Sequence, residues 1–241
     1  SDYDISMNTI VTNMTMLRTV CNWVRKQGVT NNDPFFGYDM PKALYGTPYF
    51  LTIQERDQVL DADLTDDAEL AEYRDMFVFQ CMVGCRHSDL VTFTPKNIID
   101  GVLEYIPIKT KGKLGDVVRV PLIPKAMAIL DGHDHGDDEP IFPKHYNFKF
   151  NDAIRRILKR AKVNRVVTVI NPKTRLEEKK PISDVATSHL ARRTFIGNLY
   201  RMVKDPDLVA SMSGHAKGSV AFARYRVIDD DMKKSLVELI Q

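Results

Sequence analysis

Four short patterns in the sequence carry side chains that could act together on a phosphate group. In chain order they contain Arg86, then Lys109, then the pair His189 and Arg192, then the pair His215 and Tyr225. Cationic side chains bind anionic oxygens, while imidazole and phenol groups exchange protons or act as nucleophiles. Each pattern by itself also fits an ordinary structural role, so we weigh them singly and then together.

Arg86 lies in the run Gly-Cys-Arg-His-Ser-Asp-Leu, residues 84–90, at the end of an apolar stretch with helical character. A guanidinium in this position would be costly to bury unless it met an anion, because an unpaired buried charge is strongly destabilising. The alternative is a helix-terminal arginine that donates hydrogen bonds to the last carbonyl groups of its helix.

His189 and Arg192 lie three residues apart in a stretch that predicts a helix. Residues at this spacing share a helix face, so both side chains can point at one ligand. Arg193, four residues after His189, competes with Arg192 for the same role. The alternative is an ordinary polar pair on the protein surface.

His215 follows Gly214, which predicts the end of a helix and places the histidine in the turn after it. Tyr225 comes ten residues later, on the next short element. The alternative is a capping histidine and a core tyrosine.

The run Lys-Thr-Lys-Gly-Lys, residues 109–113, lies between two β-rich segments and predicts a basic hairpin turn. Such a turn could contact an anion, or it could simply be solvated.

In order and approximate spacing, these patterns resemble the tyrosine recombinase family, also called the phage integrase family. That family uses an arginine, a lysine, His-x-x-Arg, a histidine or tryptophan, and a tyrosine. The resemblance covers roughly residues 52–241 and includes Val-Pro-Leu at 120–122, His-Leu-Ala-Arg-Arg-Thr-Phe at 189–195 and Ser-Gly-His at 213–215. Residues 186–226 look especially similar to integrases of Bacteroides-type mobile elements.

The resemblance implies a site-specific recombinase that cleaves and rejoins DNA through a covalent 3′-phosphotyrosyl intermediate, with Tyr225 as the nucleophile. Arg86 and Arg192 would hold the non-bridging phosphate oxygens, where negative charge develops. His189 and His215 would add hydrogen bonds and help to move protons, and the lysine would protonate the departing 5′-hydroxyl. Because one phosphoester replaces another, the reaction requires no ATP, metal or other cofactor.

Two details depart from the pattern of the family. The interval from His215 to Tyr225 is one residue longer than expected, although no other tyrosine follows His215. The hairpin turn is also longer than usual, which leaves Lys109, Lys111 and Lys113 as candidates for the catalytic lysine. We favour Lys109 because Lys-Thr at the end of a β-rich run resembles the Lys-Thr of the family.

Charge is unevenly distributed, although the net charge is only +2. Residues 144–180 contain twelve lysines and arginines against three acids, and residues 51–75 contain nine acids against two arginines. A basic stretch of this size suits DNA, whose phosphates supply most of the sequence-independent affinity. The alternative is a solvated helix face.

Hydrophobic periodicity divides the chain into an opening helix, a linker and a larger region. Apolar residues from Ile10 to Val24 predict one helix of about 20 residues that stops at Gly28. Residues 29–50 are rich in Pro, Gly and Asn and predict an extended linker. Beyond residue 50 we expect hairpins over 102–122 and from 165 onward, and helices from 52 and over 68–85, 124–130, 148–162, 188–203, 206–212, 219–225 and 230–240.

The expected fold is a mostly helical α+β catalytic domain, residues 51–241, with a small antiparallel sheet. The resemblance implies that residues 1–28 are the last helix of a truncated core-binding domain. A linker at residues 29–50 joins this helix to the catalytic domain. Cys21, Cys81 and Cys85 predict reduced thiols. The run His-Asp-His at 133–135 predicts a surface loop rather than a metal site.

The implied partner is double-stranded DNA at attachment sites, on which the protein would self-associate into a tetrameric synapse. The apolar face of residues 230–240 could pack in a neighbouring protomer or within its own chain, and the free truncated chain is expected to be monomeric. The sequence has no apolar run of membrane-spanning length and no secretory signal, which predicts an intracellular location. The resemblance implies that this location is the bacterial cytoplasm.

Two other functions fit the same residues. A type IB topoisomerase shares the residue set but relaxes supercoils without exchanging partners. A DNA-binding regulator could keep the fold and lose the chemistry. The sequence does not specify the DNA target, nor whether integration, excision or inversion is the natural role.

Overall fold

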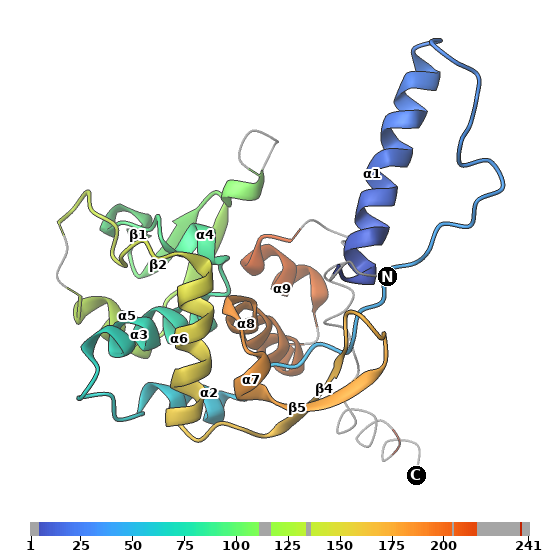
Figure 1. The fold of residues 1–241 in the computed structure, drawn as a ribbon. Coiled ribbons are helices and arrows are strands. Elements are labelled where there is room, and N and C mark those ends of the chain that lie inside the picture. Colours follow the sequence, from blue (N-terminus) through green and yellow to red (C-terminus); the bar gives the residue numbers. More distant parts are fainter. Residues whose placement is uncertain (1–4, 111–116, 134–135, 204, 216–236, 238–241) are drawn as a thin grey trace. The chain divides into compact units, whose positions relative to one another are not determined.

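The computed structural model describes residues 5–110, 117–133, 136–203, 205–215 and 237. Contacts within the chain separate it into two compact units (Figure 1). One unit comprises Ser1–Thr47 and Thr168–Lys180, and the other comprises Pro48–Val167 and Pro181–Gln241. The helices predicted over 219–225 and 230–240 lie outside the described residues, apart from Val237.

The smaller unit is built on α1 (Met7–Lys26), a helix of 20 residues. Ser6 caps its start, because the Ser6 hydroxyl accepts a hydrogen bond from the backbone N–H of Thr9. Gly28 follows its end with a φ of +73°. The predicted opening helix is confirmed, and residues 29–50 form neither helix nor strand, as expected.

Strands β4 (Val166–Ile170) and β5 (Glu177–Pro181) form the second predicted hairpin. Its turn is stabilised by Asn171, whose side-chain oxygen accepts hydrogen bonds from the backbone N–H groups of Lys173 and Thr174. The backbone N–H of Met7 donates to the carbonyl of Pro172 at 3.1 Å, which joins the turn to the start of α1. None of the described helices has the length and hydropathy that crossing a membrane requires.

The core of the larger unit surrounds α3 (Ala68–Val83), which is completely buried from Met76 to Val83. A helix that is apolar on every side must be covered on every side. Helices α2 (Ile53–Leu60), α5 (Pro124–Asp131), α6 (Asn147–Arg160) and α8 (Ser188–Val203) all pack against it. Three further helices complete the described α-helices of this unit: α4 (His87–Leu90), α7 (Ile182–Val185) and α9 (Pro206–Ser213).

A three-stranded antiparallel sheet lies beside these helices, in the order β1 (Ile98–Ile99), β2 (Val102–Tyr105) and β3 (Val118–Pro121). Burial alternates along β2 and β3, so Leu103 and Val120 face the core as a cross-strand pair. The first predicted hairpin is confirmed, although its strands are shorter than the β-rich segments in the sequence. The chain leaves β2 through η2 (Ile108–Thr110), a single 3-10 turn that carries Lys109.

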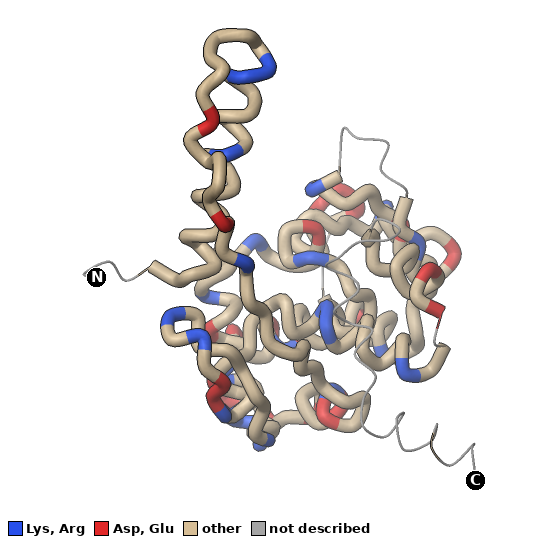
Figure 2. The backbone as a smooth tube through the Cα atoms, turned by 90° about the vertical axis from the view of Figure 1, so that its right-hand side faces the viewer, with Lys and Arg blue, Asp and Glu red and all other residues tan. Residues whose placement is uncertain are grey.

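Part of the basic stretch is paired with the acidic stretch. Arg156, Arg160 and Arg165 form ion pairs with Asp67, Asp66 and Glu55, respectively. Lysine and arginine positions are therefore interleaved with acidic positions over the larger unit (Figure 2). This finding weakens the prediction that the whole basic stretch faces DNA, because these three cations already have carboxylate partners within the protein.

Two glycines end helices in the left-handed conformation and permit close packing. Gly84, after α3, has a φ of +68°, and a Cβ atom there would lie 2.2 Å from the ring of Phe195 on α8. Gly214, after α9, has a φ of +64°, and its Cβ would lie 3.0 Å from Val118 of β3. Both positions therefore require glycine for their backbone conformation, and Gly84 requires it for space as well.

We expect Gly84→Ala to lower the free energy of unfolding by about 2–5 kcal/mol, because it adds both left-handed strain and an overlap with Phe195. Gly101 is the matched control: its φ is +74°, but no heavy atom lies within 4 Å of the position that a Cβ would take. Gly101→Ala should therefore lose only about 1–2 kcal/mol. Urea denaturation of the two variants measures the difference, and equal losses would contradict the packing argument.

Candidate active site

The centre of the candidate site is Arg192 on α8, the largest fully buried side chain among the described residues. Its side chain joins two other elements. One guanidinium nitrogen donates a hydrogen bond to the carbonyl of Gly84 at 2.7 Å, and the other lies 3.0 Å from Nδ1 of His215. Neither of these two contacts carries a negative charge, so an anion could still interact favourably with this guanidinium.

Arg86 is the N-cap residue of α4, two residues beyond the glycine that ends α3. Its side chain is about a quarter exposed, and Nη1 lies 4.0 Å from Oδ2 of Asp89. Nη1 is itself buried and has no hydrogen-bond partner among the described residues. A buried guanidinium N–H without an acceptor is costly, and an anionic oxygen would satisfy it.

His215 follows the left-handed Gly214, which turns the chain back towards α8. Its Nδ1 also lies 2.9 Å from the hydroxyl of Ser213. Arg192 can donate only to an unprotonated ring nitrogen, so this contact favours a neutral imidazole. The other nitrogen of a neutral ring carries a proton that it can donate to an oxygen atom.

The electrostatics of His215 connect it with four other predicted residues. Its pKa is lowered to about 3, first by burial and then by the positive charges of Arg192, Arg86, His189 and Lys109. Like charges disfavour protonation of an imidazole, and their influence requires that they lie near it. The structure therefore brings together predicted residues that are as much as 129 positions apart along the chain.

Asp89 is a member of the site that the sequence reasoning missed. Its side chain is only 2% exposed, and Oδ1 accepts a hydrogen bond from the backbone N–H of Ile108 at 2.9 Å. Asp89 thus links Arg86 to the turn that carries Lys109. The available signal was its position three residues after Arg86, but an acid in the first turn of a helix is so common that the spacing did not distinguish it.

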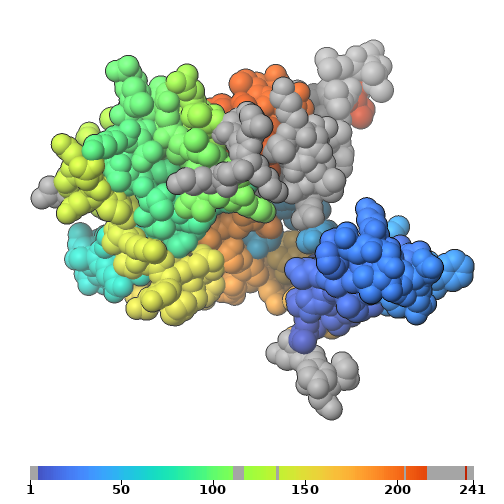
Figure 3. Space-filling model, turned by 90° about the horizontal axis from the view of Figure 1, so that it is seen from above, coloured from blue at the N-terminus to red at the C-terminus, as the bar shows by residue number. Residues whose placement is uncertain are grey.

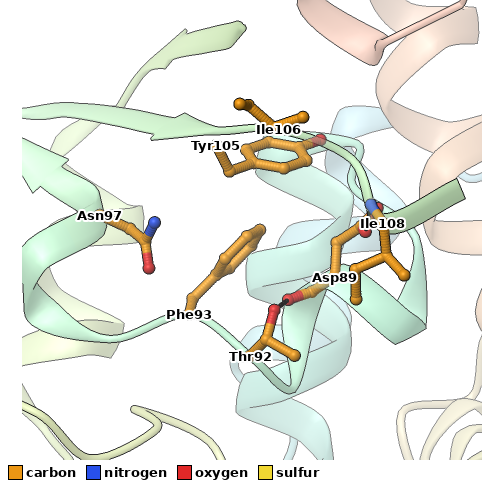
Figure 4. Close-up of a pocket in the computed structure, with 7 residues that line it drawn as sticks. All are labelled: Asp89, Thr92, Phe93, Asn97, Tyr105, Ile106 and Ile108. Carbon is orange, nitrogen blue, oxygen red and sulfur yellow. Dashed lines mark hydrogen bonds between the residues drawn. The ribbon is translucent and has the colours of Figure 1, made fainter. Parts of the chain in front are cut away.

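A cavity of about 340 Å³ adjoins Asp89 on the side of the sheet (Figure 4). The rings of Phe93 and Tyr105 both line it and contact each other edge to face, with their centroids 4.9 Å apart and an angle of 60° between their planes. The hydroxyl of Tyr105 is buried without a hydrogen-bond partner among the described residues, and burial raises its pKa. Unsatisfied atoms of Arg86, Asp89 and Tyr105 therefore gather on this side of the site.

The other predicted residues differ in burial and in their contacts. His189 is exposed at the start of α8, and Lys109 is exposed on its turn. The guanidinium of Arg193 lies over the ring of Tyr49, 5.1 Å from its centroid, whereas Arg192 reaches His215. The choice of Arg192 over Arg193 thus agrees with the geometry. Tyr225, Lys111 and Lys113 lie outside the described residues.

The hairpin beside the site and α9 are in contact, because α9 packs against β3. In Figure 3 the hairpin of β2 and β3 (green) and α9 (orange) lie next to each other.

Comparison with known proteins identifies the fold. The model of the phage integrase family matches residues 49–232, well over half of the chain. The chain belongs to the phage integrase family. This confirms the predicted tyrosine-recombinase fold and, at the level of the family, the prediction of a site-specific recombinase. No curated protein matches this chain.

Solved structures of similar fold include the Tn1549 transposon integrase in complex with transposon right end DNA, with a TM-score of 0.66 and 15% identity over 98% of this chain and 80% of that one. A lambda integrase dimer bound to a COC′ core site gives a TM-score of 0.60 and 16% identity over 94% and 81%. The structure of XerA recombinase gives a TM-score of 0.56 and 16% identity, over 84% of this chain and 67% of that one. At such low identity these likenesses show the fold alone.

We predict that the His215 ring of the integrase stays neutral down to about pH 3, whereas an ordinary histidine titrates near pH 6.5. NMR titration of the imidazole resonances measures this, with His215→Gln used to assign the signal. Arg86→Gln removes one of the neighbouring positive charges and should raise the pKa of His215. An unchanged titration curve in Arg86→Gln would show that the two side chains do not interact.

Proposed function

We propose that this integrase cleaves and rejoins double-stranded DNA through a covalent 3′-phosphotyrosyl intermediate, with these catalytic residues: Arg86, Lys109, His189, Arg192, His215 and Tyr225. The observation that carries the proposal is that a buried arginine, a second arginine with an unsatisfied N–H group, and a neutral imidazole adjoin one another. This combination suits a phosphodiester, which needs both charge neutralisation and hydrogen bonds.

The two arginines would hold the phosphate. A phosphodiester resists attack because its negative charge repels a nucleophile, and further charge develops on its non-bridging oxygens in the transition state. Guanidinium groups that are already oriented stabilise that charge without having to reorganise. The buried contacts of Arg192 with Gly84 and His215 supply this orientation.

The histidines would donate hydrogen bonds and move protons. Nη2 of Arg192 lies 3.0 Å from Nδ1 and 3.3 Å from Nε2 of His215. One nitrogen of a neutral ring can accept from Arg192, and the proton on the other nitrogen would be donated to the phosphate. A bound phosphate would oppose the neighbouring cations and bring the pKa of His215 closer to its ordinary value. His189, exposed at the start of α8, would add a further hydrogen bond to the phosphate.

Tyr225 would supply the nucleophile. Its oxygen forms a bond to phosphorus while the bond from phosphorus to the 5′-oxygen breaks, and the phenol proton passes to a basic group of the site. Lys109 donates a proton to the departing 5′-oxygen. Attack by another 5′-hydroxyl on the phosphotyrosyl bond reverses these steps, and strand exchange results when that hydroxyl belongs to a different duplex.

The wider setting follows from the family. The Tn1549 integrase was solved in complex with transposon right end DNA and the lambda integrase on a core site, and we propose the same class of partner for this chain. We further propose a mobile element of the Bacteroides type as its source, action in the bacterial cytoplasm, and a tetrameric synapse assembled on DNA from free monomers. Residues 1–28 would then be the last helix of a core-binding domain and residues 29–50 its linker.

Covalent trapping tests the chemistry. In a pool of nicked duplexes with randomised sequence, cleavage just before the nick releases a short fragment that carries the 5′-hydroxyl. Loss of this leaving group prevents religation and traps the phosphotyrosyl adduct. We expect an adduct that survives denaturing electrophoresis with the natural chain and none with Tyr225→Phe, because the phenyl ring has no nucleophile. An adduct that persists in Tyr225→Phe would refute the assignment of the nucleophile, and binding without any adduct would indicate a DNA-binding protein.

Asp89→Asn tests the link between Arg86 and Lys109. The asparagine oxygen can still accept from the N–H of Ile108, but the negative charge beside Arg86 is lost. We expect single-turnover cleavage of a trapped duplex to slow by up to about 100-fold through misplacement of these groups, with little change in DNA affinity. Asp100→Asn, in an exposed turn, is the control. Equal cleavage rates for all three proteins would exclude a positioning role for Asp89.

A further inference from the structure

Two aromatic rings stand exposed at the start of α6. Tyr146, the N-cap residue, is 74% exposed and Phe148 is 68% exposed. The rings are stacked, with centroids 6.0 Å apart and an angle of 22° between their planes. The rest of the apolar face of α6, which includes Phe150 and Ile154, is buried in the core. The folding of this unit therefore does not require the exposed pair, and exposed apolar patches commonly mark binding surfaces.

This pair adjoins the candidate active site. The hydroxyl of Ser188 donates a hydrogen bond to the side chain of Asn147, and the backbone N–H of Ser188 donates to Asn151 at 2.7 Å. Both asparagines lie on the first turns of α6, and Ser188 directly precedes His189 on α8. The start of α6 is thereby fixed against the start of the helix that carries His189 and Arg192.

The surroundings of the rings are basic. Lys144 and Lys149 flank them, both at least partly exposed, and neither forms an ion pair with any residue that the structure describes. The nearest acid along the chain, Asp152, pairs with Arg155 at 3.2 Å. This contrasts with the far end of α6, where Arg156 and Arg160 are paired with acids. These two lysines therefore lie beside exposed apolar rings and have no carboxylate partner among the described residues. This combination favours a ligand that is anionic and also presents apolar groups.

We propose that Tyr146, Phe148, Lys144 and Lys149, called here the α6 patch, contact DNA beside the scissile phosphate and select for thymine there. The inference rests on the proposed function and adds a specificity determinant to it. The lysines bind backbone phosphates, which carry no sequence information. The rings pack against the C5-methyl groups of thymine, which distinguish thymine from every other base in the major groove.

Selection from randomised DNA tests the proposal. The natural chain and Tyr146→Ala/Phe148→Ala each bind a pool of duplexes with randomised sequence, and the bound DNA is sequenced. We expect the natural chain to prefer thymine at one to a few adjacent positions beside the cleavage point, which the trapped adducts locate. The double variant should lose the preference at those positions and keep the others. Identical preferences in both proteins would overturn the proposal.

Deoxyuridine provides a second measurement, because it lacks only the C5-methyl group. Replacing thymine by deoxyuridine at the selected positions should weaken binding of the natural chain by about fourfold for each methyl group lost. The same replacement should leave the affinity of the double variant unchanged. Equal effects on the two proteins would show that the rings do not contact the methyl groups.

Two further variants separate specificity from general effects. Ile99→Ala removes an apolar side chain that is 50% exposed on β1 and should leave the selected sequence unchanged. Lys144→Ala/Lys149→Ala should weaken binding to all sequences alike and make it less sensitive to salt. If the natural chain neither selects DNA nor forms an adduct, the proposed function fails; if it does both and the double variant selects the same sequence, only the role of the α6 patch fails.

Discussion

The site depends on the burial of one guanidinium. Arg192 has lost nearly all contact with water, and such a charge is tolerated only where dipoles or opposite charges replace the lost hydration. The carbonyl of Gly84 and the ring of His215 supply two such contacts, from the ends of α3 and α9. One side chain therefore fixes the mutual position of three helices, and removing it would affect the architecture as well as the chemistry.

The surroundings of Arg192 contain polar groups that burial leaves unsatisfied or uncharged. Arg86 and Tyr105 have buried hydrogen-bonding atoms without partners among the described residues, and a neutral His215 lies among positive charges that keep it unprotonated. These features cost folding free energy in the absence of a ligand, because buried polar groups are stable only when satisfied. Functional sites commonly carry such unsatisfied groups, and a phosphate placed between the arginines would satisfy several of them at once.

Charge along the sequence proved a poor guide to the surface that meets DNA. The longest basic stretch contains Arg156, Arg160 and Arg165, and each of these forms an ion pair with an acid of residues 55–67. Such pairs form because the fold lays α6 beside α2 and the start of α3, which composition cannot reveal. Lys144 and Lys149, at the start of α6, have no ion-pair partner in the described part of the chain and make a smaller basic surface. This surface lies close to His189, which makes it a better candidate for DNA contact than its charge alone would.

The sequence by itself determined the local elements and the family. Helix caps, helix stops and helical periodicity depend on near neighbours in the chain, so the ends of these elements could be predicted to within a few residues. Examples are the cap at Thr52 with Glu55, the stops at Gly28 and Gly214, and the periodicity of residues 188–203. Only the tertiary structure decided which arginine faces His215, because Arg192 and Arg193 differ by one position on a helix whose packing sets their directions. It also decided the roles of Asp89 and of the glycine at 84: their partners, Ile108 and Phe195, lie far away along the chain, and no local pattern encodes a contact that exists only after the chain has folded.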